Sequence, residues 1–264
     1  GLSRWFGSSG LCVIQLLIGF WIFLLYEIYK KKLPLKNLFF FGLINITLLH
    51  SLGGLLISSP HGNIGYPTAI WQTNITIRDK LFLSNEEMAE KLIDAQNNAF
   101  QKNADLLVMP EGTLRSDFVM SNSSILDTLA GGFRITNGNI RSSLLAFKEG
   151  DTNYSSFIDK TRLVPIGEKI PNFISNFSKG LTLINGLQSG ENSRYFKFKN
   201  KPPLAVAICY EISDSMKIRK AVNKGAQLIL SIANLDPYPL TIQKQFISLA
   251  RMRSIENNRD NLII

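Results

Sequence analysis

Three segments of this chain begin or end at side chains that together could catalyse the transfer of an acyl group. The apolar run 204–208 leads directly into Cys209. The apolar run 106–109 leads through a proline to Glu111, and Lys160 stands just before a third segment, Leu-Val-Pro-Ile-Gly-Glu. An apolar strand that ends in a reactive side chain places it at the rim of a sheet, where a substrate can reach it. A thiol, a carboxylate and an amine are the parts of a covalent acyl-transfer site.

Each of these residue types has a definite role in such chemistry. A free thiol has a pKa of about 8.5 and is a weak nucleophile at neutral pH, so Cys209 needs a base. Glu111 can take the thiol proton and later return a proton to a leaving group. Lys160 can stabilise the negative oxygen of a tetrahedral intermediate, a contribution of about 3 kcal/mol for one donor. The backbone N–H of Tyr210, directly after the cysteine, is a second candidate donor.

Taken one at a time, these residues have plainer explanations. A buried cysteine is most often a small apolar side chain, and a glutamate or lysine at a strand end is usually a solvated surface charge. The prediction of a catalytic site depends on all three occurring in order, each in an unusual local sequence. Another alternative is a domain that has lost its catalytic activity and serves as a binding or scaffold module. The intact set of three residues argues against it.

Other kinds of chemistry find little support in the sequence. The two cysteines, Cys12 and Cys209, lie in segments of different character, and neither has metal-ligand spacing. The two histidines, His50 and His61, are too few for a zinc site or a histidine-based triad. These residues therefore predict no metal site. The net charge of +9 would permit binding to anionic lipid or to nucleic acid. No compact basic stripe occurs outside residues 30–36, so we do not expect nucleic acid as a partner.

Two uncharged runs near the beginning of the chain predict membrane-spanning helices. Residues 7–26 and 37–59 carry no charge. About 20 residues of helix are enough to cross the hydrocarbon core of a bilayer. Buried core helices and a cleaved signal peptide are the alternatives, and two full-length runs in tandem argue against both. Asn45, Thr47 and His50 in the second run suggest packing against other helices, because polar side chains are costly in lipid.

The charges that flank these runs predict their orientation. The connector carries four lysines within residues 30–36, whereas the outer flanks carry only Arg4 before the first run and no basic residue until Arg78 after the second. Short lysine-rich loops remain in the cytoplasm. We expect the connector to lie in the cytoplasm, and everything after about Pro60 to lie on the extracytoplasmic side.

The remainder of the chain alternates between strand-like and helix-like segments, which indicates an α/β layered domain. Ser84 and Glu87 form a possible capping box before a helix whose face would carry Met88, Leu92, Ala95 and Ala99. The predicted strands are 68–76, 106–109, 142–147, 204–208 and 227–233. Further helices are predicted near 215–223 and 241–257.

Two stretches, 113–139 and 171–203, are predicted to be long loops. Loops of this length in a compact domain are usually functional or mobile. Each contains an apolar cluster, at 118–120 and at 173–177. These clusters could enter the lipid interface near the membrane helices, or they could fold back onto the core.

Four segments resemble the nitrilase superfamily, and in particular its membrane branch, the apolipoprotein N-acyltransferases. Residues 109–114, Met-Pro-Glu-Gly-Thr-Leu, resemble the strand-end Pro-Glu of the superfamily. Residues 160–171, Lys-Thr-Arg-Leu-Val-Pro-Ile-Gly-Glu-Lys-Ile-Pro, resemble a string typical of the membrane branch. Residues 208–211, Ile-Cys-Tyr-Glu, resemble the nucleophile segment, and residues 250–259 resemble a late helix of the family.

The resemblance covers the whole chain and implies its architecture and site. It implies a nitrilase-like αββα sandwich preceded by a transmembrane helical hairpin. Residues 1–60 would be part of a larger membrane domain, and residues 61–264 a catalytic domain that is truncated at its C-terminal end. By this resemblance the catalytic triad is Glu111, Lys160 and Cys209, and the supporting or substrate-binding residues are Glu168, Tyr210 and Glu211.

The implied reaction moves a fatty acyl chain from a phospholipid to the cysteine as a thioester, and then to the N-terminal amine of a diacylglyceryl-cysteine apolipoprotein. By the same resemblance, this reaction needs no metal and no dissociable cofactor. The implied location is the bacterial inner membrane, with several spans and a periplasmic catalytic domain. The alternative is a membrane-tethered amidase of the nitrilase type, in which water accepts the acyl group.

Some positions depart from the family pattern. The family usually has Phe at Ile166 and His at Arg162. Residues 234–239 replace a typical Asn-Asp-Ala-Trp-Phe-Gly, and Lys80 is followed by Leu81 instead of Trp. These departures leave the triad intact but bear on the shape of the substrate pockets.

Overall fold

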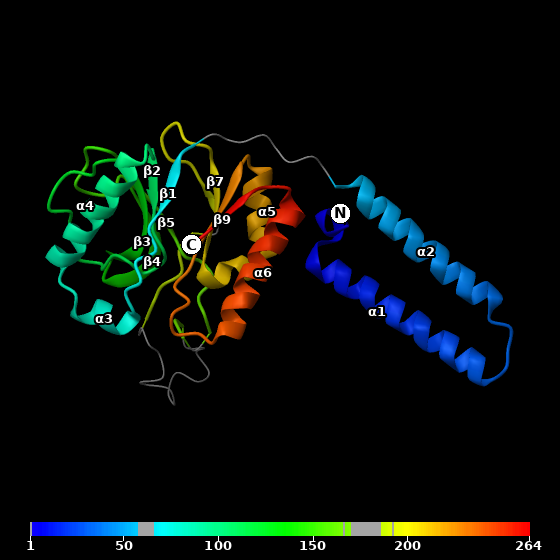
Figure 1. The fold of residues 1–264 in the computed structure, drawn as a ribbon. Helices are drawn as coiled ribbons and strands as arrows, with labels where there is room; N and C mark the ends of the chain where they lie inside the picture. The colour runs from blue at the N-terminus through cyan, green and yellow to red at the C-terminus, as the bar shows by residue number, and fades with distance from the viewer. Residues whose placement is uncertain (1, 58–65, 166, 170–185, 192) are drawn as a thin grey trace, which may run out of the picture. The chain divides into compact units, whose positions relative to one another are not determined.

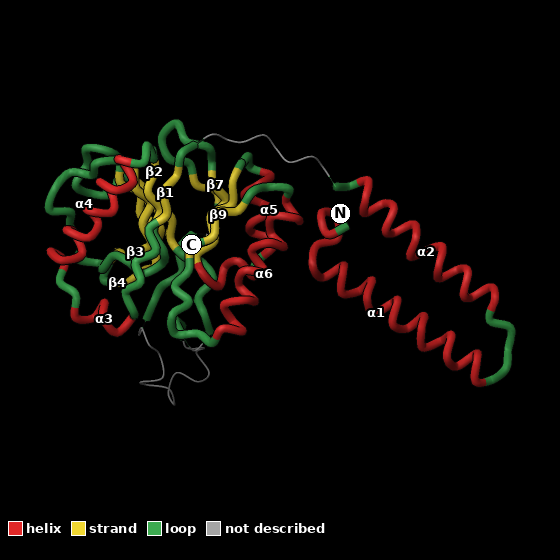
Figure 2. The backbone as a smooth tube through the Cα atoms, viewed as in Figure 1, coloured by secondary structure: helices red, strands yellow, loops and turns green. Residues whose placement is uncertain are grey.

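The computed structural model describes residues 2–57, 66–165, 167–169, 186–191 and 193–264, without the side chains of Ile77 and Leu81. The chain forms two compact units (Figures 1 and 2). One is built on a pair of long helices, and the other is an α/β unit that contains two sheets.

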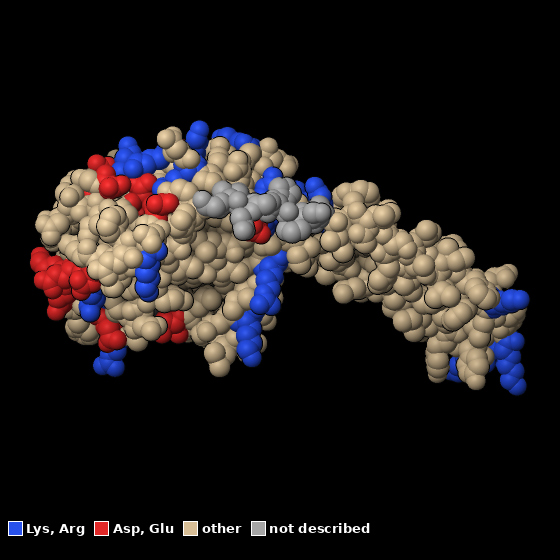
Figure 3. Space-filling view, turned by 45° about the horizontal axis from the view of Figure 1, so that its top comes forward, with Lys and Arg blue, Asp and Glu red and all other residues tan. Residues whose placement is uncertain are grey.

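The first unit contains the helices α1 (Ser3–Lys30) and α2 (Lys36–Leu55). Both are long and apolar enough to cross a membrane by length and composition, which confirms the prediction of two long apolar helices. Along the middle of the hairpin the face seen in Figure 3 carries no charged side chain, whereas lysines gather at the connector. The Trp21 indole N–H donates to the Leu38 carbonyl at 2.9 Å. A Cβ at position 42 would lie 1.9 Å from the Trp21 ring, so this packing requires Gly42.

The three polar side chains of α2 are satisfied within their own helix. Each makes a hydrogen bond with the backbone carbonyl four residues earlier: Asn45 to Phe41 (2.8 Å), Thr47 to Leu43 (2.9 Å) and His50 to Ile46 (3.0 Å). Such bonds reduce the cost of a polar group in lipid. The expected packing of these residues against other helices stays a prediction.

The first sheet has the strand order β1-β2-β3-β4-β5. Its strands are β1 (Thr68–Ile70), β2 (Leu106–Val108), β3 (Asp127–Thr136), β4 (Asn139–Phe147) and β5 (Ser156–Asp159). Strands β1, β2 and β3 are parallel, and β3, β4 and β5 are antiparallel. The strand predicted at 68–76 is therefore shorter than expected.

The prediction of a loop over 113–139 is wrong for β3, which occupies the second half of that stretch. Strands β3 and β4 form a hairpin that turns at Asn137 and Gly138, both with positive φ (51° and 75°). Asn-Gly is a strong signal for a two-residue hairpin turn. The adjacent glycines Gly131 and Gly132 inside the strand obscured its pattern, because glycine is uncommon in strand interiors.

The second sheet has the order β6-β7-β8-β9. Its strands are β6 (Tyr195–Phe196), β7 (Leu204–Ile208), β8 (Leu228–Ile232) and β9 (Asn261–Ile263). Strands β7, β8 and β9 are parallel, and β6 is antiparallel to β7. The strands predicted at 204–208 and 227–233 are confirmed, whereas β6 lies in a stretch that was predicted to be a loop.

The two sheets pack face to face between helices, giving an αββα arrangement (Figure 1). Alternation along the strands produces these layers. Leu106 and Val108 of β2 join the core between the sheets, together with Val206 of β7. Leu107 faces the other way and packs with Leu92 of the helix α4 (Asn85–Gln101).

The outer face of the second sheet is covered by α5 (Ser215–Asn223) and α6 (Leu240–Asn257). Ala205 and Ala207 of β7 pack there with Ile218 of α5 and Phe246 of α6. A short helix α3 (Ile77–Phe82) precedes α4, and a 3₁₀ helix η1 (Cys209–Ser213) follows β7. The predicted α/β class is therefore confirmed.

Helix α4 begins as its sequence predicts. The Ser84 hydroxyl accepts from the Glu87 N–H at 3.1 Å, and the Glu87 carboxylate accepts from the Ser84 N–H at 2.9 Å. This is the predicted capping box. On the predicted face, Met88, Leu92 and Ala99 are buried and Ala95 is partly buried.

The apolar cluster 118–120 folds back onto the core. Met120 is buried and Phe118 packs against the same cluster of residues as Leu92, whereas Val119 remains exposed. The second apolar cluster, 173–177, lies outside the described residues.

The packing of α4 predicts that Leu92→Ala lowers the free energy of unfolding by about 2–5 kcal/mol, because Leu92 is fully buried and its truncation leaves a cavity. Unfolding of the full-length protein in neutral detergent measures this. Glu90→Ala, on the exposed side of the same helix, is the matched control and should change stability by no more than about 0.5 kcal/mol. Equal effects of the two substitutions would contradict the packing.

Candidate active site

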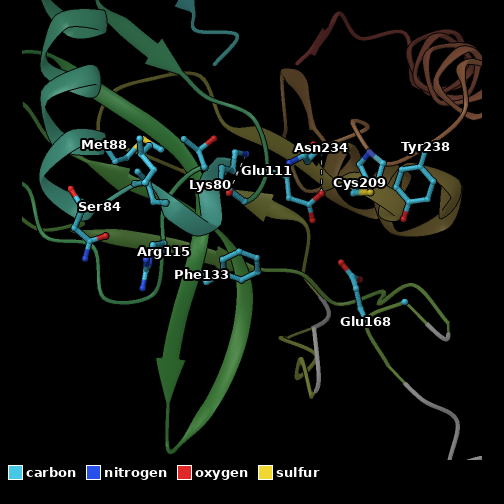
Figure 4. A pocket seen from close by; sticks show the side chains of 17 residues that line it. Lys80, Ser84, Met88, Glu111, Arg115, Phe133, Glu168, Cys209, Asn234 and Tyr238 are labelled. Carbon is cyan, nitrogen blue, oxygen red and sulfur yellow. Dashed lines mark hydrogen bonds between the residues drawn. The ribbon is translucent and has the colours of Figure 1, made fainter. Parts of the chain in front are cut away.

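Glu111 is held just beyond the end of β2. The chain there passes so close to β3 that a Cβ at position 131 would lie 2.3 Å from the Pro110 oxygen, which is why β3 has Gly131. The Glu111 carboxylate is buried, with the residue 7% exposed. It accepts from the Ser142 hydroxyl at 3.3 Å. It also accepts from the Asn234 N–H at 3.4 Å (Figure 4). These contacts come from β4 and from the segment after β8, and they fix the direction of the carboxylate.

Lys160 directly follows β5 and has no exposed surface. Its ammonium donates to Glu111 at 2.9 Å and to Glu168 at 2.6 Å. The second oxygen of Glu168 accepts from the Val164 N–H at 2.8 Å, which orients that carboxylate. Burial opposes the charged form of Lys160, but the negative charges around it, chiefly that of Glu111 and also that of Glu168, outweigh burial and raise the pKa of Lys160. The structure thus holds a permanent positive charge between two carboxylates.

Cys209 stands where β7 ends and η1 begins. Its φ of 50° lies in the left-handed region, which non-glycine residues rarely adopt and which stores strain at functional sites. This sharp change of direction brings the thiol to the wall of a cavity that Glu111 and Glu168 also line.

The surroundings of Cys209 favour the protonated form of its thiol. Burial, followed by the negative charge of Glu111, raises the pKa of the Cys209 thiol to about 12, while the positive charge of Lys160 acts in the opposite direction. The free thiol is thus the resting form at neutral pH. A reaction at this sulfur requires its proton to leave as the new bond forms.

Glu211 does not line the cavity but joins the segments that carry Lys160 and Cys209. Its residue is 1% exposed. One oxygen accepts from the Thr161 N–H and hydroxyl at 2.7 and 2.8 Å and from the Arg162 N–H at 3.3 Å, and the other accepts from the Ile208 N–H at 2.9 Å and from Arg194 at 2.7 Å. The carboxylate therefore connects the backbone after Lys160 to the backbone before Cys209.

Arg194 is a buried residue that the sequence analysis missed. Its guanidinium is bound to the Glu211 carboxylate and also donates to the Asp159 carbonyl, directly before Lys160. It lies in a stretch predicted to be a loop and belongs to no motif, so no sequence signal pointed to it.

Asp159 is a second missed residue. It accepts from Arg134 at 2.6 and 2.8 Å, from Arg141 at 3.1 Å and from the Ser143 hydroxyl at 2.7 Å. Burial alone would raise the pKa of Asp159, but these hydrogen bonds lower it. The charged Asp159 anchors the end of β5, and therefore the position of Lys160.

The side chain of Tyr210 lies outside the cavity. It is 37% exposed, and the Arg162 guanidinium lies 5.1 Å from its ring centroid. Of the six residues singled out from the sequence, Glu111, Glu168 and Cys209 line the cavity. Lys160 does not line it but binds the carboxylates of Glu111 and Glu168.

The cavity has a volume of about 530 Å³, within the usual range for ligand sites. Figure 4 shows Cys209, Asn234 and Tyr238 toward one side of it and Lys80, Ser84, Met88 and Arg115 toward the other, with Glu111 between them. Leu83, Leu114 and Phe133 add apolar surface. The cavity is thus mainly apolar, with a few convergent polar groups. Among the described residues, no group of three or more His, Cys, Asp or Glu could hold a metal ion.

The arrangement of layers and the position of the site define a class of protein. No family model matches the chain. The structure is similar to Nit3 of Saccharomyces cerevisiae, a member of the nitrilase superfamily, with a TM-score of 0.54 and 16% identity over 75% of this chain and 74% of that one. It is also similar to an amidase mutant from Nesterenkonia sp. AN1 that shows covalent addition at its active-site cysteine, with a TM-score of 0.52 and 14% identity over 77% of this chain and 79% of that one. The fold is that of the nitrilase superfamily, as the sequence predicted.

The sequence comparison is more specific. The chain is 54% identical over all 264 residues to an apolipoprotein N-acyltransferase of Prochlorococcus marinus subsp. pastoris, and it covers 53% of that protein. A second one, from another strain of Prochlorococcus marinus, is 44% identical over the same length. The chain is a homologue of the apolipoprotein N-acyltransferases, and it spans about half the length of these relatives.

The buried ion pair between Arg194 and Glu211 predicts the effect of removing its cation. Arg194→Met should lower the free energy of unfolding by about 3–5 kcal/mol, because it leaves the Glu211 carboxylate buried without a positive partner. Arg162→Met is the control, since its 3.7 Å pair with Asp214 is partly exposed and should contribute about 0–1 kcal/mol. The double variant Arg194→Met, Glu211→Gln should lose less than the sum of the single losses. Strict additivity would show that the two side chains are not coupled.

The negative charge of Glu111 near the Cys209 thiol predicts that Glu111→Gln makes the thiol more reactive toward an alkylating reagent. In a Cys12→Ser background, Cys209 should react slowly with iodoacetamide at about pH 8, because its raised thiol pKa leaves little thiolate. Glu111→Gln removes the repelling charge, lowers that pKa and should increase the alkylation rate severalfold. The exposed Glu149→Gln is the control and should have no effect. A slower reaction in Glu111→Gln would contradict the electrostatic argument.

Proposed function

We propose that this chain is the catalytic part of an apolipoprotein N-acyltransferase in which Cys209 carries the acyl group as a thioester. The observation that supports this most is the Lys160 ammonium, 2.9 Å from a Glu111 carboxylate that lines the same cavity as Cys209. A base, a fixed positive charge and a nucleophile beside a mainly apolar cavity suit the transfer of a fatty acyl chain.

In the first half-reaction, the Cys209 sulfur attacks the ester carbonyl of a phospholipid while Glu111 takes the thiol proton. Lys160 lies beside Glu111 and acts through its charge on the tetrahedral oxyanion. The intermediate then breaks its bond to the glycerol oxygen, which receives the proton from Glu111. A lysophospholipid leaves and the thioester remains.

In the second half-reaction, the amine of a diacylglyceryl-cysteine apolipoprotein attacks the thioester. Glu111 accepts a proton from the amine, the carbon–sulfur bond breaks, and the sulfur regains a proton. Glu168 orients Lys160 throughout, and Glu211 positions the two segments that carry Lys160 and Cys209. Tyr210 contributes through its backbone N–H as a second oxyanion donor.

The two apolar helices anchor the catalytic part in a membrane. We place the boundary between the membrane helices and the catalytic domain at about residue 60. The lysines of the connector between α1 and α2 put that connector in the cytoplasm and the catalytic domain on the opposite side. The donor is then a lipid of the same bilayer, and the acceptor is a lipoprotein anchored in it.

The proposal predicts that Cys209→Ala abolishes both the acyl adduct on the protein and the transfer of the chain to a lipopeptide, because no sulfur is left to carry it. In the test, the full-length protein is incubated with phospholipid and a diacylated lipopeptide. The masses of the protein and of the lipopeptide are then measured. Glu111→Gln should block the formation of the thioester, while Cys12→Ala should behave as the unaltered protein.

An adduct on the Cys209→Ala protein, or undiminished transfer by it, would remove Cys209 from the mechanism. Release of free fatty acid with no acylated lipopeptide would identify a membrane-tethered hydrolase instead.

A further inference from the structure

Lys80 brings a positive charge into the cavity that none of the acyl-transfer steps uses. It lies in α3, lines the cavity, and its ammonium donates to the Gly112 carbonyl at 3.3 Å. Because Gly112 directly follows Glu111, this bond places Lys80 next to the proposed base. Figure 4 shows Lys80 and Cys209 on opposite sides of Glu111.

The other charges that line the cavity already have partners. Glu111 and Glu168 both bind Lys160. Arg115 pairs with Asp117 at 3.3 Å, and both side chains are more than half exposed. Lys80 differs, because no carboxylate among the described residues forms an ion pair with it.

The surroundings of Lys80 favour the arrival of an anion. Burial lowers the pKa of Lys80, whereas the charges of Glu111 and Asp236 act in the opposite direction. A partly desolvated ammonium with one carbonyl partner has two N–H donors left for a ligand. Hydrogen bonds from such a donor to a negatively charged oxygen are among the stronger ones.

We propose that Lys80 binds the phosphate of the phospholipid acyl donor while the donor's ester carbonyl lies at Cys209. This inference rests on the proposed function. A short glycerol backbone separates ester from phosphate in a glycerophospholipid, so one donor can reach both sides of Glu111. Met88, Leu114 and Phe133 supply apolar surface for the rest of the lipid.

The assignment makes Lys80 specific to one half of the reaction. The acceptor is a thioether-linked diacylglycerol on a peptide and has no phosphate. In a two-step mechanism with a covalent intermediate, kcat/KM for the donor depends only on the steps up to the thioester, and kcat/KM for the acceptor only on the later steps. Loss of Lys80 should therefore affect the first value and spare the second.

The kinetic test compares Lys80→Met with the unaltered full-length protein in neutral detergent. With phosphatidylglycerol as donor, kcat/KM should fall about tenfold, the loss of one charge-assisted hydrogen bond. With diacylglycerol of the same chain length, and for the lipopeptide acceptor, kcat/KM should not change. Lys80→Arg should retain most of the activity. Lys91→Met, an exposed lysine of α4, is the matched control.

A binding test does not depend on transfer activity. In a Cys209→Ala background, a diether phosphatidylglycerol, which cannot donate an acyl chain, should bind about tenfold more weakly when Lys80 is replaced by Met. A diether glycerol should bind equally to both proteins. Weaker binding that is confined to the phosphate-bearing lipid supports the proposal even if the protein proves not to be a transferase.

Three results would overturn the assignment. The first is an equal loss with the phosphate-bearing and phosphate-free lipids, which would make Lys80 a structural residue. The second is unchanged binding of the diether phosphatidylglycerol to Lys80→Met. The third is binding of inorganic phosphate as tightly as the phospholipid, which would make this a site for a free anion.

Discussion

The geometry of the site depends on one buried contact, the Glu211 carboxylate bound to the Arg194 guanidinium. Lys160 comes from the end of a strand in the first sheet, and Cys209 comes from the end of a strand in the second. Hydrophobic packing holds the sheets together but is not directional and does not fix how two strand ends face each other. The Glu211 carboxylate supplies this direction, because it accepts hydrogen bonds from the backbone on both sides.

Around this contact the charged groups lie close together. Lys160 binds both Glu111 and Glu168, while burial and the charge of Glu111 disfavour a thiolate at Cys209. In the proposed reaction, the thiolate is therefore generated as the substrate reacts and not beforehand. The left-handed backbone at Cys209 has a separate effect: it directs the thiol away from its strand and toward the cavity.

Part of the site could be predicted from sequence because Glu111 and Cys209 lie at strand ends, where apolar runs stop at a reactive side chain. Lys160 was singled out instead by the segment that follows it, since residues 156–159 were not predicted to be a strand. Arg194 and Asp159 could not be predicted in this way, because their partners are distant in the sequence. The partners of Asp159 lie on β3 and β4 of its own sheet, and Arg194 reaches the Asp159 carbonyl only when the two sheets pack. Strand β3 was missed for a local reason: its paired glycines, one of which the approach of Glu111 requires, weaken the strand signal.

The protonated state of the Cys209 thiol also affects how fast it is oxidised. Peroxide and disulfides react with thiolates and only slowly with thiols. Burial and the charge of Glu111 favour the neutral form of the Cys209 sulfur, so we expect it to be converted only slowly to sulfenic acid or to mixed disulfides while no substrate is bound. The surroundings that make the resting thiol unreactive would thus also slow its oxidation.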